Sequence, residues 1–192
     1  MLRTVHAIPT LLDYAILGHL QREPLSGYAI RKLFATTPMA HYSDSPGSIY
    51  PALARLRRHG LVTASVQKKQ TLRPRQVFRP TAAGMDALTR WVSAPVTREE
   101  IVSGRGSVML RFVFAEQVLG LTAAVRLLES FEQVLRAYVP ELERFLDETR
   151  ARMPFAARLA LGRGVEAHAA DLRWVRDALR ELRRAIARKE AV

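Results

Sequence analysis

The chain has no cysteine among its 192 residues. This absence excludes disulfide bonds and thiolate metal sites. The sequence also has neither the apolar run of about 18 residues that a membrane-spanning helix needs nor the core of a signal peptide. We therefore expect a cytoplasmic protein that has no membrane partner.

Sequence motifs of enzymes are missing as well. The five histidines form neither an HExxH motif nor a close pair, so a zinc site has little support. The chain has no G-x-S-x-G motif, no P-loop and no dinucleotide fingerprint. Residues 104–107, with the sequence GRGS, lack a preceding strand, and we interpret them as a loop that caps the next helix. We expect no enzyme activity, no catalytic residue, no metal ion and no cofactor.

Acidic residues are scarce in the first half of the chain. Residues 1–95 contain 13 Lys and Arg against 4 Asp and Glu, a net charge of +9, whereas residues 96–192 carry only +3. A basic surface can serve solubility alone, but charge concentrated on one half favours a polyanionic partner. The distribution of charge indicates a nucleic-acid-binding first half.

The segment 45–60 is punctuated as a helix at both ends. Ser45 is a suitable N-cap, Pro46 fits the first turn, and Gly60 suits a left-handed C-terminal position. Pro51 removes a backbone donor, so we expect an irregular first turn. One face of this helix is apolar, and the other carries polar and basic residues. We interpret the segment as a DNA-recognition helix whose contacts with the major groove or its phosphates come from Ser48, Tyr50, Arg55 and Arg58.

The flanking segments complete a winged helix-turn-helix pattern. A capping box at Thr10 and Asp13 begins a helix that runs to about residue 21, and Ser26 caps a second helix that ends near Thr36. Alternating residues at 62–67 and a short run at 76–79 predict a β-hairpin. Its cationic tip suits a wing on the phosphate backbone, and the alternative is a solvated loop kept soluble by charge. The tip cations are Lys68, Lys69, Arg73 and Arg75.

These residues resemble the PadR-like transcriptional regulators. The resemblance rests on SPGSIYPALARLRRHGLV at 45–62, AILGHL at 15–20, PLSGYAI at 24–30 and RPRQVFRPTAAG at 73–84. The chain departs from the family pattern at Leu72, Phe78 and Pro80, where the family has Gly, Tyr and an apolar residue. The resemblance implies a regulator of transcription, usually a repressor relieved by a ligand or stress signal. It also implies that Tyr28 contacts a phosphate, and packing between helices is the alternative.

The second half of the chain is expected to be helical. Residues 93–97 separate it from the first half, and we place the domain boundary at 95. Apolar residues recur every seven positions in the last helix, with others at intervening positions, which is typical of a seam between helices. We expect this seam to form a homodimer through Val165, Leu172, Val175, Leu179, Leu182 and Ile186.

Aromatic residues make up only 7% of the chain, yet several fall in this second half. A flat apolar effector would need such residues as stacking partners. The alternative is that they only fill the core and the dimer interface. The effector hypothesis concerns Phe112, Phe114, Phe131, Tyr138 and Trp174.

The sequence therefore predicts a mainly α fold with two domains. Residues 1–95 form a winged helix-turn-helix with a small β-hairpin wing, and residues 96–192 form an α-helical dimerisation domain that also holds any effector site. The predicted function is a dimeric regulator that binds a dyad-symmetric operator in double-stranded DNA, and small-molecule release is a further expectation. The alternative is a winged-helix adaptor that binds protein or RNA without operator specificity.

Overall fold

The computed structural model describes residues 9–36, 46–69, 72–103 and 106–190. The chain divides into two compact units, Met1–Trp91 and Val92–Val192. The functions expected for the two halves stay predictions. Among the described residues, no helix is both long enough and apolar enough to cross a membrane.

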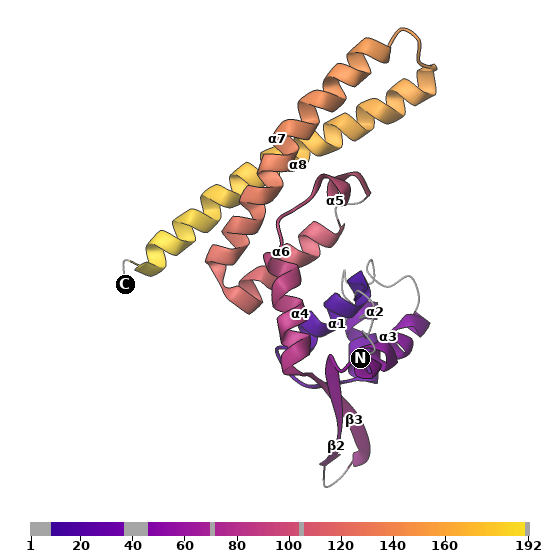
Figure 1. Cartoon of the computed structure of the whole chain (residues 1–192), viewed down its shortest axis with the longest axis vertical. Helices are drawn as coiled ribbons and strands as arrows, with labels where there is room; N and C mark the ends of the chain where they lie inside the picture. The colour runs from indigo at the N-terminus through magenta and orange to yellow at the C-terminus, as the bar shows by residue number, and fades with distance from the viewer. Residues whose placement is uncertain (1–8, 37–45, 70–71, 104–105, 191–192) are drawn as a thin grey trace, which may run out of the picture. The chain divides into compact units, whose positions relative to one another are not determined.

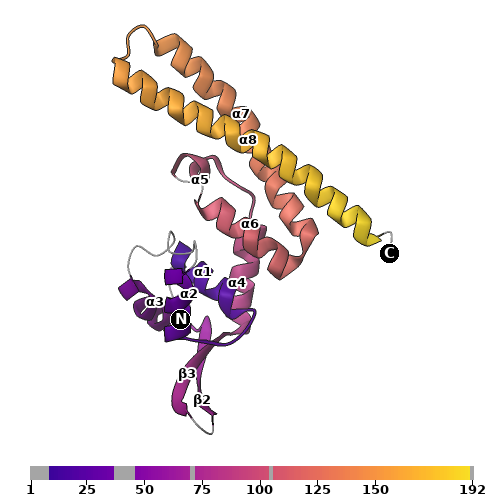
Figure 2. The ribbon, with the colours of Figure 1, turned by 180° about the vertical axis from the view of Figure 1, so that it is seen from behind.

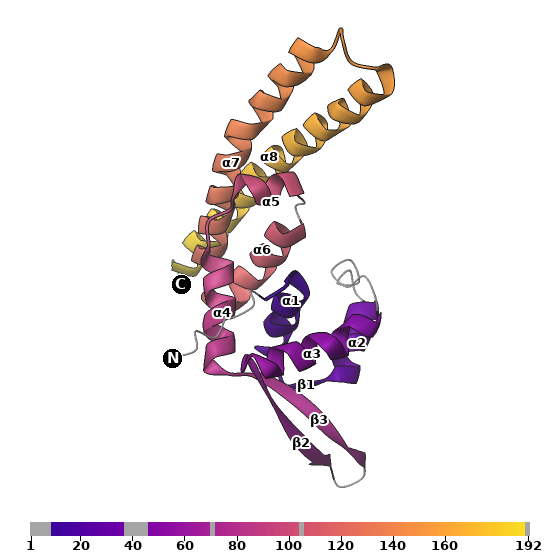
Figure 3. The same ribbon diagram turned by 45° about the vertical axis from the view of Figure 1, so that its right-hand side comes forward.

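The first unit is a winged helix-turn-helix, as predicted (Figure 1). Helices α1 (Leu11–Leu20), α2 (Gly27–Thr36) and α3 (Ile49–Arg58) are followed by strands β2 (Val62–Lys69) and β3 (Leu72–Pro80) and by helix α4 (Ala82–Ser93). Figure 3 shows β2 and β3 as a hairpin. Buried side chains of the three leading helices and of α4 form the core, with Ile16, Leu17, Ile30, Ile49, Leu53, Leu56 and Leu88 among its most enclosed members.

Local capping fixes where the first two helices begin. The Thr10 hydroxyl accepts from the Asp13 amide at 3.3 Å, and the Asp13 carboxylate accepts from the Thr10 amide at 2.8 Å. This reciprocal pair is the capping box expected from the sequence. At α2, the Ser26 hydroxyl accepts from the Ala29 amide at 3.2 Å, so Ser26 is the predicted cap.

The recognition helix begins irregularly, as Pro51 led us to expect. A 3₁₀ turn, Pro46–Ser48, precedes α3, and Gly60 has the left-handed φ of 68° expected after its end. The predicted cap Ser45 lies outside the described residues. Three-residue turns of this kind are common at helix ends, because they satisfy backbone groups that the α-helical pattern leaves over.

A third strand, which the sequence pattern did not predict, joins the wing to α2. Strand β1 (Leu25–Ser26) pairs with β3, placing Leu25 opposite Phe78 and Ser26 opposite Val77. The antiparallel order is β1-β3-β2. A two-residue strand has no periodicity to detect. Its pairing ties the residues just before α2 to the base of the hairpin.

Helix α4 packs closely on the turn after α3. The Thr81 hydroxyl donates to the Gly60 carbonyl at 2.6 Å and accepts from the Gly84 amide at 3.0 Å. A Cβ at position 84 would lie 2.0 Å from the Leu61 carbonyl oxygen. Only glycine therefore permits this approach of α4 to the backbone of Leu61.

The second unit consists of α-helices and their connecting loops in its described part. Helix α5 (Arg98–Ser103) is followed by α6 (Gly106–Leu119), α7 (Leu121–Thr149) and α8 (Phe155–Glu190). Pro140 lies within α7, and the helix continues through it. Helices α7 and α8 lie side by side along much of their length (Figure 2).

Candidate nucleic-acid interface

The exposed face of α3 differs in part from the face expected from the sequence. Tyr50 and Arg58 are exposed as predicted, whereas Ser48 is half-buried. Arg57, which was not among the predicted contacts, is also exposed. Position 57 follows Tyr50 by seven residues, which returns to almost the same side of a helix. That spacing was the signal by which Arg57 could have been found.

Arg55 lies in the last turn of α3 and binds Asp13 of α1. Its Nε donates to Asp13 Oδ2 at 2.9 Å, and its Nη2 donates to Asp13 Oδ1 at 2.6 Å. The Asp13 side chain is 2% exposed and that of Arg55 is 31% exposed. The hydrogen bond to Asp13, followed by attraction to its charge, raises the pKa of Arg55 despite some desolvation. The structure gives Arg55 a role in joining two helices, and its contact with DNA stays a prediction.

Replacing Asp13 with alanine is expected to destabilise the first unit by about 2 kcal/mol. The change removes half of the capping box, worth about 1 kcal/mol, and leaves the Arg55 fork without its carboxylate. Because Arg55 is partly exposed, water compensates for some of that loss. Urea denaturation followed by circular dichroism measures the change. An Asp86→Ala variant, at an exposed position in α4, is the control, and equal stabilities of the two variants would contradict the assignment.

A hollow of about 540 Å³ lies beside the exposed face of α3, and we call it the α2–wing hollow. Tyr28 is 60% exposed at its rim, so this side chain is not packed between helices. A Cβ at Gly27 would lie 2.6 Å from Tyr50 Cε1, so glycine lets the Tyr50 ring rest against the start of α2. The hollow is lined by Ser26, Gly27, Tyr28, Tyr50, Arg75, Gln76 and Phe78.

Of the four wing cations, the structure shows the side chain of Arg75. It is exposed and lines the α2–wing hollow. The backbone of Arg75 pairs with Gln67 across the hairpin. The side chains of Lys68, Lys69 and Arg73 lie outside the described part of the molecule, so their contacts stay predictions. The wing thus contributes one described cation to the surface that also holds Tyr28 and Tyr50.

The heptad residues of α8 fall into two groups. Val165, Val175 and Leu179 are buried within the single chain, because α8 packs against α7. Contrary to the expectation for the whole set, these three have little surface left for a second copy. The other members are half-buried, and their role in dimerisation stays a prediction. This second group is Leu172, Leu182 and Ile186.

The five aromatic residues considered for an effector differ in how deeply they are buried. Phe114 and Phe131 are 1% and 0% exposed and belong to the core. Phe112 meets Trp174 edge-to-face with ring centroids 5.8 Å apart, and Tyr138 meets His168 at 5.2 Å. The effector site stays a prediction, and Trp174, at 41% exposed, is its most accessible member. Among the described residues, no group of three His, Cys, Asp or Glu side chains could hold a metal ion.

Comparison with known proteins finds similarity within the first unit. Residues 16–90 match the model of the transcriptional regulator PadR-like family. The negative transcriptional regulator PadR of Bacillus subtilis (strain 168) is 32% identical over 82 residues, which are 43% of this chain and 45% of that protein. The match thus spans less than half the length of this curated relative.

Solved PadR structures resemble the chain over most of its length. Bacillus subtilis PadR in complex with operator DNA has a TM-score of 0.41 at 24% identity, covering 90% of this chain and 99% of that one. The same protein with p-coumaric acid gives 0.39 at 23% identity, with the same shares of the two chains. A PadR-like regulator from Bacillus cereus gives 0.42 at 22%, covering 91% and 97%. The sequence match is confined to residues 16–90, and over this segment the chain is similar to the PadR-like family of transcriptional regulators.

Proposed function

We propose that the chain regulates transcription by binding operator DNA through its first unit. The observation that carries this proposal is a set of exposed aromatic and cationic side chains on α2, α3 and the wing. They gather around the α2–wing hollow or on the adjoining face of α3, in the half of the chain with a net charge of +9. The set consists of Tyr28, Tyr50, Arg57, Arg58 and Arg75.

In this proposal α3 enters the major groove of the operator. Arg57 and Arg58 meet base edges or phosphates there, because a guanidinium suits both. Tyr28 and Arg75 contact the phosphate backbone beside the groove, where such contacts position the protein without reading sequence. Arg55 supports this arrangement by binding Asp13, because this contact joins α3 to α1.

We further propose that the protein acts as a dimeric repressor. The Bacillus subtilis relative is named a negative regulator, which favours repression. A twofold dimer would place two recognition helices about 34 Å apart, one DNA turn. A second copy could cover large apolar side chains that are exposed on the second unit. These side chains include Val113, Phe145, Phe155, Leu159 and Trp174.

Release of DNA by a small-molecule effector is the finer part of the proposal. A relative has been crystallised with p-coumaric acid, a planar aromatic molecule. In this chain, the Phe112–Trp174 pair offers a partly exposed aromatic edge in the second unit. Flat ligands bind next to such rings by stacking. We therefore place the effector near Trp174, whose fluorescence reports binding directly.

Replacing both Arg57 and Arg58 with glutamine is expected to weaken DNA binding and its dependence on salt. If each arginine neutralises one phosphate per protomer, a dimer loses about four contacts, and the log–log salt slope falls by roughly 3 to 4. The measurement is a fluorescence-anisotropy titration at several salt concentrations, on genomic fragments enriched by the wild-type protein. The double variant Arg173→Gln and Arg184→Gln, at exposed positions of α8, controls for net charge.

Two results would count against the proposal. The first is an Arg57 and Arg58 variant that keeps the wild-type salt slope and binds DNA no more weakly than the α8 control. The DNA contact would then lie elsewhere than on α3. Enriched fragments without any twofold-related sequence would favour the adaptor alternative, because such an adaptor needs no operator. Recovery of discrete palindromic sites supports only the operator-binding function.

A further inference from the structure

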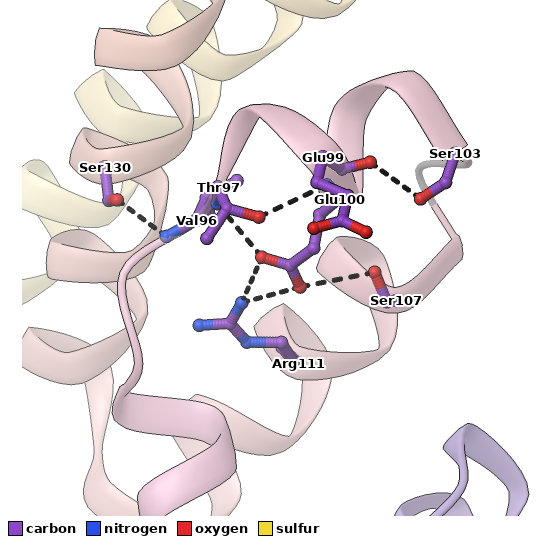
Figure 4. Close-up of polar contacts among 8 residues, drawn as sticks. All are labelled: Val96, Thr97, Glu99, Glu100, Ser103, Ser107, Arg111 and Ser130. Atoms are coloured by element: carbon purple, nitrogen blue, oxygen red, sulfur yellow. Dashed lines mark hydrogen bonds and ion pairs between the residues drawn. The ribbon is translucent and has the colours of Figure 1, made fainter.

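A buried arginine in the second unit is only partly paired. The Arg111 side chain on α6 is 2% exposed. Arginine is almost never fully buried unless its charge and its donors are partnered. Figure 4 shows the guanidinium beside α5, with one nitrogen turned towards Glu100 and the other two turned away. Those two nitrogens, Nε and Nη2, are buried and have no hydrogen-bond partner among the described residues.

Glu100 satisfies a single nitrogen of this guanidinium. Arg111 Nη1 lies 2.9 Å from Glu100 Oε1 and 3.0 Å from Oε2. The same carboxylate accepts from the Thr97 amide at 3.0 Å and from the Ser107 hydroxyl at 3.4 Å. The Glu100 side chain is also 25% exposed. The Glu100 carboxylate is therefore shared among several donors and water. It provides no acceptor for Nε and Nη2, on the opposite edge of Arg111.

The unpaired atoms are the two that match a planar oxyanion. Nε and Nη2 point in parallel, so they can donate to both oxygens of one carboxylate. The first unit contains this arrangement already: at Arg55, Nε and Nη2 donate to the two oxygens of Asp13 at 2.9 and 2.6 Å. The edge that holds a carboxylate at Arg55 is the edge that has no protein partner at Arg111.

The surroundings limit which oxyanion fits. Val108 and Phe114, three residues before and after Arg111 on the same face of α6, are 0% and 1% exposed. Apolar neighbours strengthen a charge-assisted hydrogen bond but penalise ions that carry a second charge. The buried position favours a small molecule.

We infer that the Nε–Nη2 edge of Arg111 is a binding site for a small monocarboxylate. The site lies within the second unit, on the side of the Arg111 guanidinium that is turned away from Glu100, and is separate from the Phe112–Trp174 pair considered above. It does not depend on the proposed DNA-binding function. The carboxylate supplies the two acceptors that a buried guanidinium needs, so its binding stabilises the folded second unit.

The test is a titration of the full chain with formate and with acetate, observed by nuclear magnetic resonance. The Nε–H group of a buried arginine gives a resolved ¹⁵N–¹H signal, assigned by its loss in Arg111→Lys. Chloride replaces carboxylate to keep the ionic strength constant. We expect a saturable shift of the Arg111 signal with either carboxylate and none with chloride, together with a rise in melting temperature. In Arg111→Lys the rise in melting temperature should be lost, because lysine keeps the charge but not the fork.

Arg126→Lys, at an exposed position of α7, is the matched control and should respond as the wild type does. An Arg111 signal that moves with neither carboxylate, or moves equally with chloride, overturns the inference. A rise in melting temperature that survives in folded Arg111→Lys overturns it as well. If that variant does not fold, the wild-type titration decides alone, with assignment by sequential resonances. Operator titration of the same wild-type sample separates this result from the DNA-binding proposal, since either can fail while the other holds.

Discussion

Replacing Gly84 with alanine is expected to destabilise the first unit by at least about 3 kcal/mol, which is the upper range for overpacking a close contact. The new Cβ would lie 2.0 Å from the Leu61 carbonyl oxygen. That neighbour is backbone, so it cannot rotate away as a flexible side chain would. Either α4 or the turn after α3 must move, and the Thr81 hydroxyl bridge between them would be strained.

The effect can be measured on the first unit alone. The chain has two tryptophans, and Trp91 stacks on Tyr14 with ring centroids 4.3 Å apart. In a Trp174→Phe background, fluorescence of Trp91 during urea denaturation therefore reports the first unit. Gly162→Ala in α8 is the control, because no atom lies within 4 Å of its new Cβ. Alanine there should stabilise its helix by up to about 1 kcal/mol, and a Gly84 variant that matches this control would refute the close packing of α4.

Replacing Leu179 with aspartate is expected to disrupt the packing of α8 on α7. Leu179 is 2% exposed within the single chain. Truncating a buried leucine costs about 2 to 5 kcal/mol, and an unpaired buried carboxylate adds to that cost. A loss of this size approaches the whole stability of many domains. The second unit should melt at a much lower temperature, and any dimer built on it should dissociate.

Two variants separate this effect from a direct loss of dimer contacts. Leu172→Asp changes a half-buried seam residue, so it should weaken association more than it lowers the melting temperature of the monomer. Arg184→Asp changes a neighbouring exposed residue and should leave the helical packing intact. Circular dichroism gives the melting temperature, and light scattering after size exclusion gives the mass. A Leu179 variant with wild-type melting would mean that its side chain is not enclosed by α7.

Much of the fold could be predicted because its signals are local. The capping box at Thr10 and Asp13, the Ser26 cap and the left-handed Gly60 depend on residues within one turn, and the structure has each of them. Strand β1 was missed because two residues carry no period, and its pairing with β3 is a contact distant in sequence. The wing strands also run further towards the tip than alternation alone indicated, since charged residues hide the pattern there.

The candidate site could be predicted less well, because side-chain pairing between elements decides it. Arg55 and Asp13 are 42 positions apart, and nothing in either segment shows that they meet. The seven-residue repeat of α8 showed that the helix has an apolar stripe. It did not show which helix covers that stripe, since packing on α7 and packing on a second copy need the same apolar residues. No role was predicted for Arg111, which lies in an apolar segment, because its pairing with Glu100 depends on how α5 and α6 pack.

The short strand β1 has a consequence for how this module can vary in length. Leu25 and Ser26 pair with Phe78 and Val77, so the strand that leads into α2 is held at the base of the hairpin and not near its tip. Two residues added to each wing strand near the tip would lengthen the hairpin without disturbing the helix that carries Tyr28. One residue inserted between Gln76 and Phe78 would instead reverse which side chains face the core, since strand side chains alternate. Relatives should therefore differ in the length of the wing at its tip. The number of residues between β1 and α2 should stay constant among them.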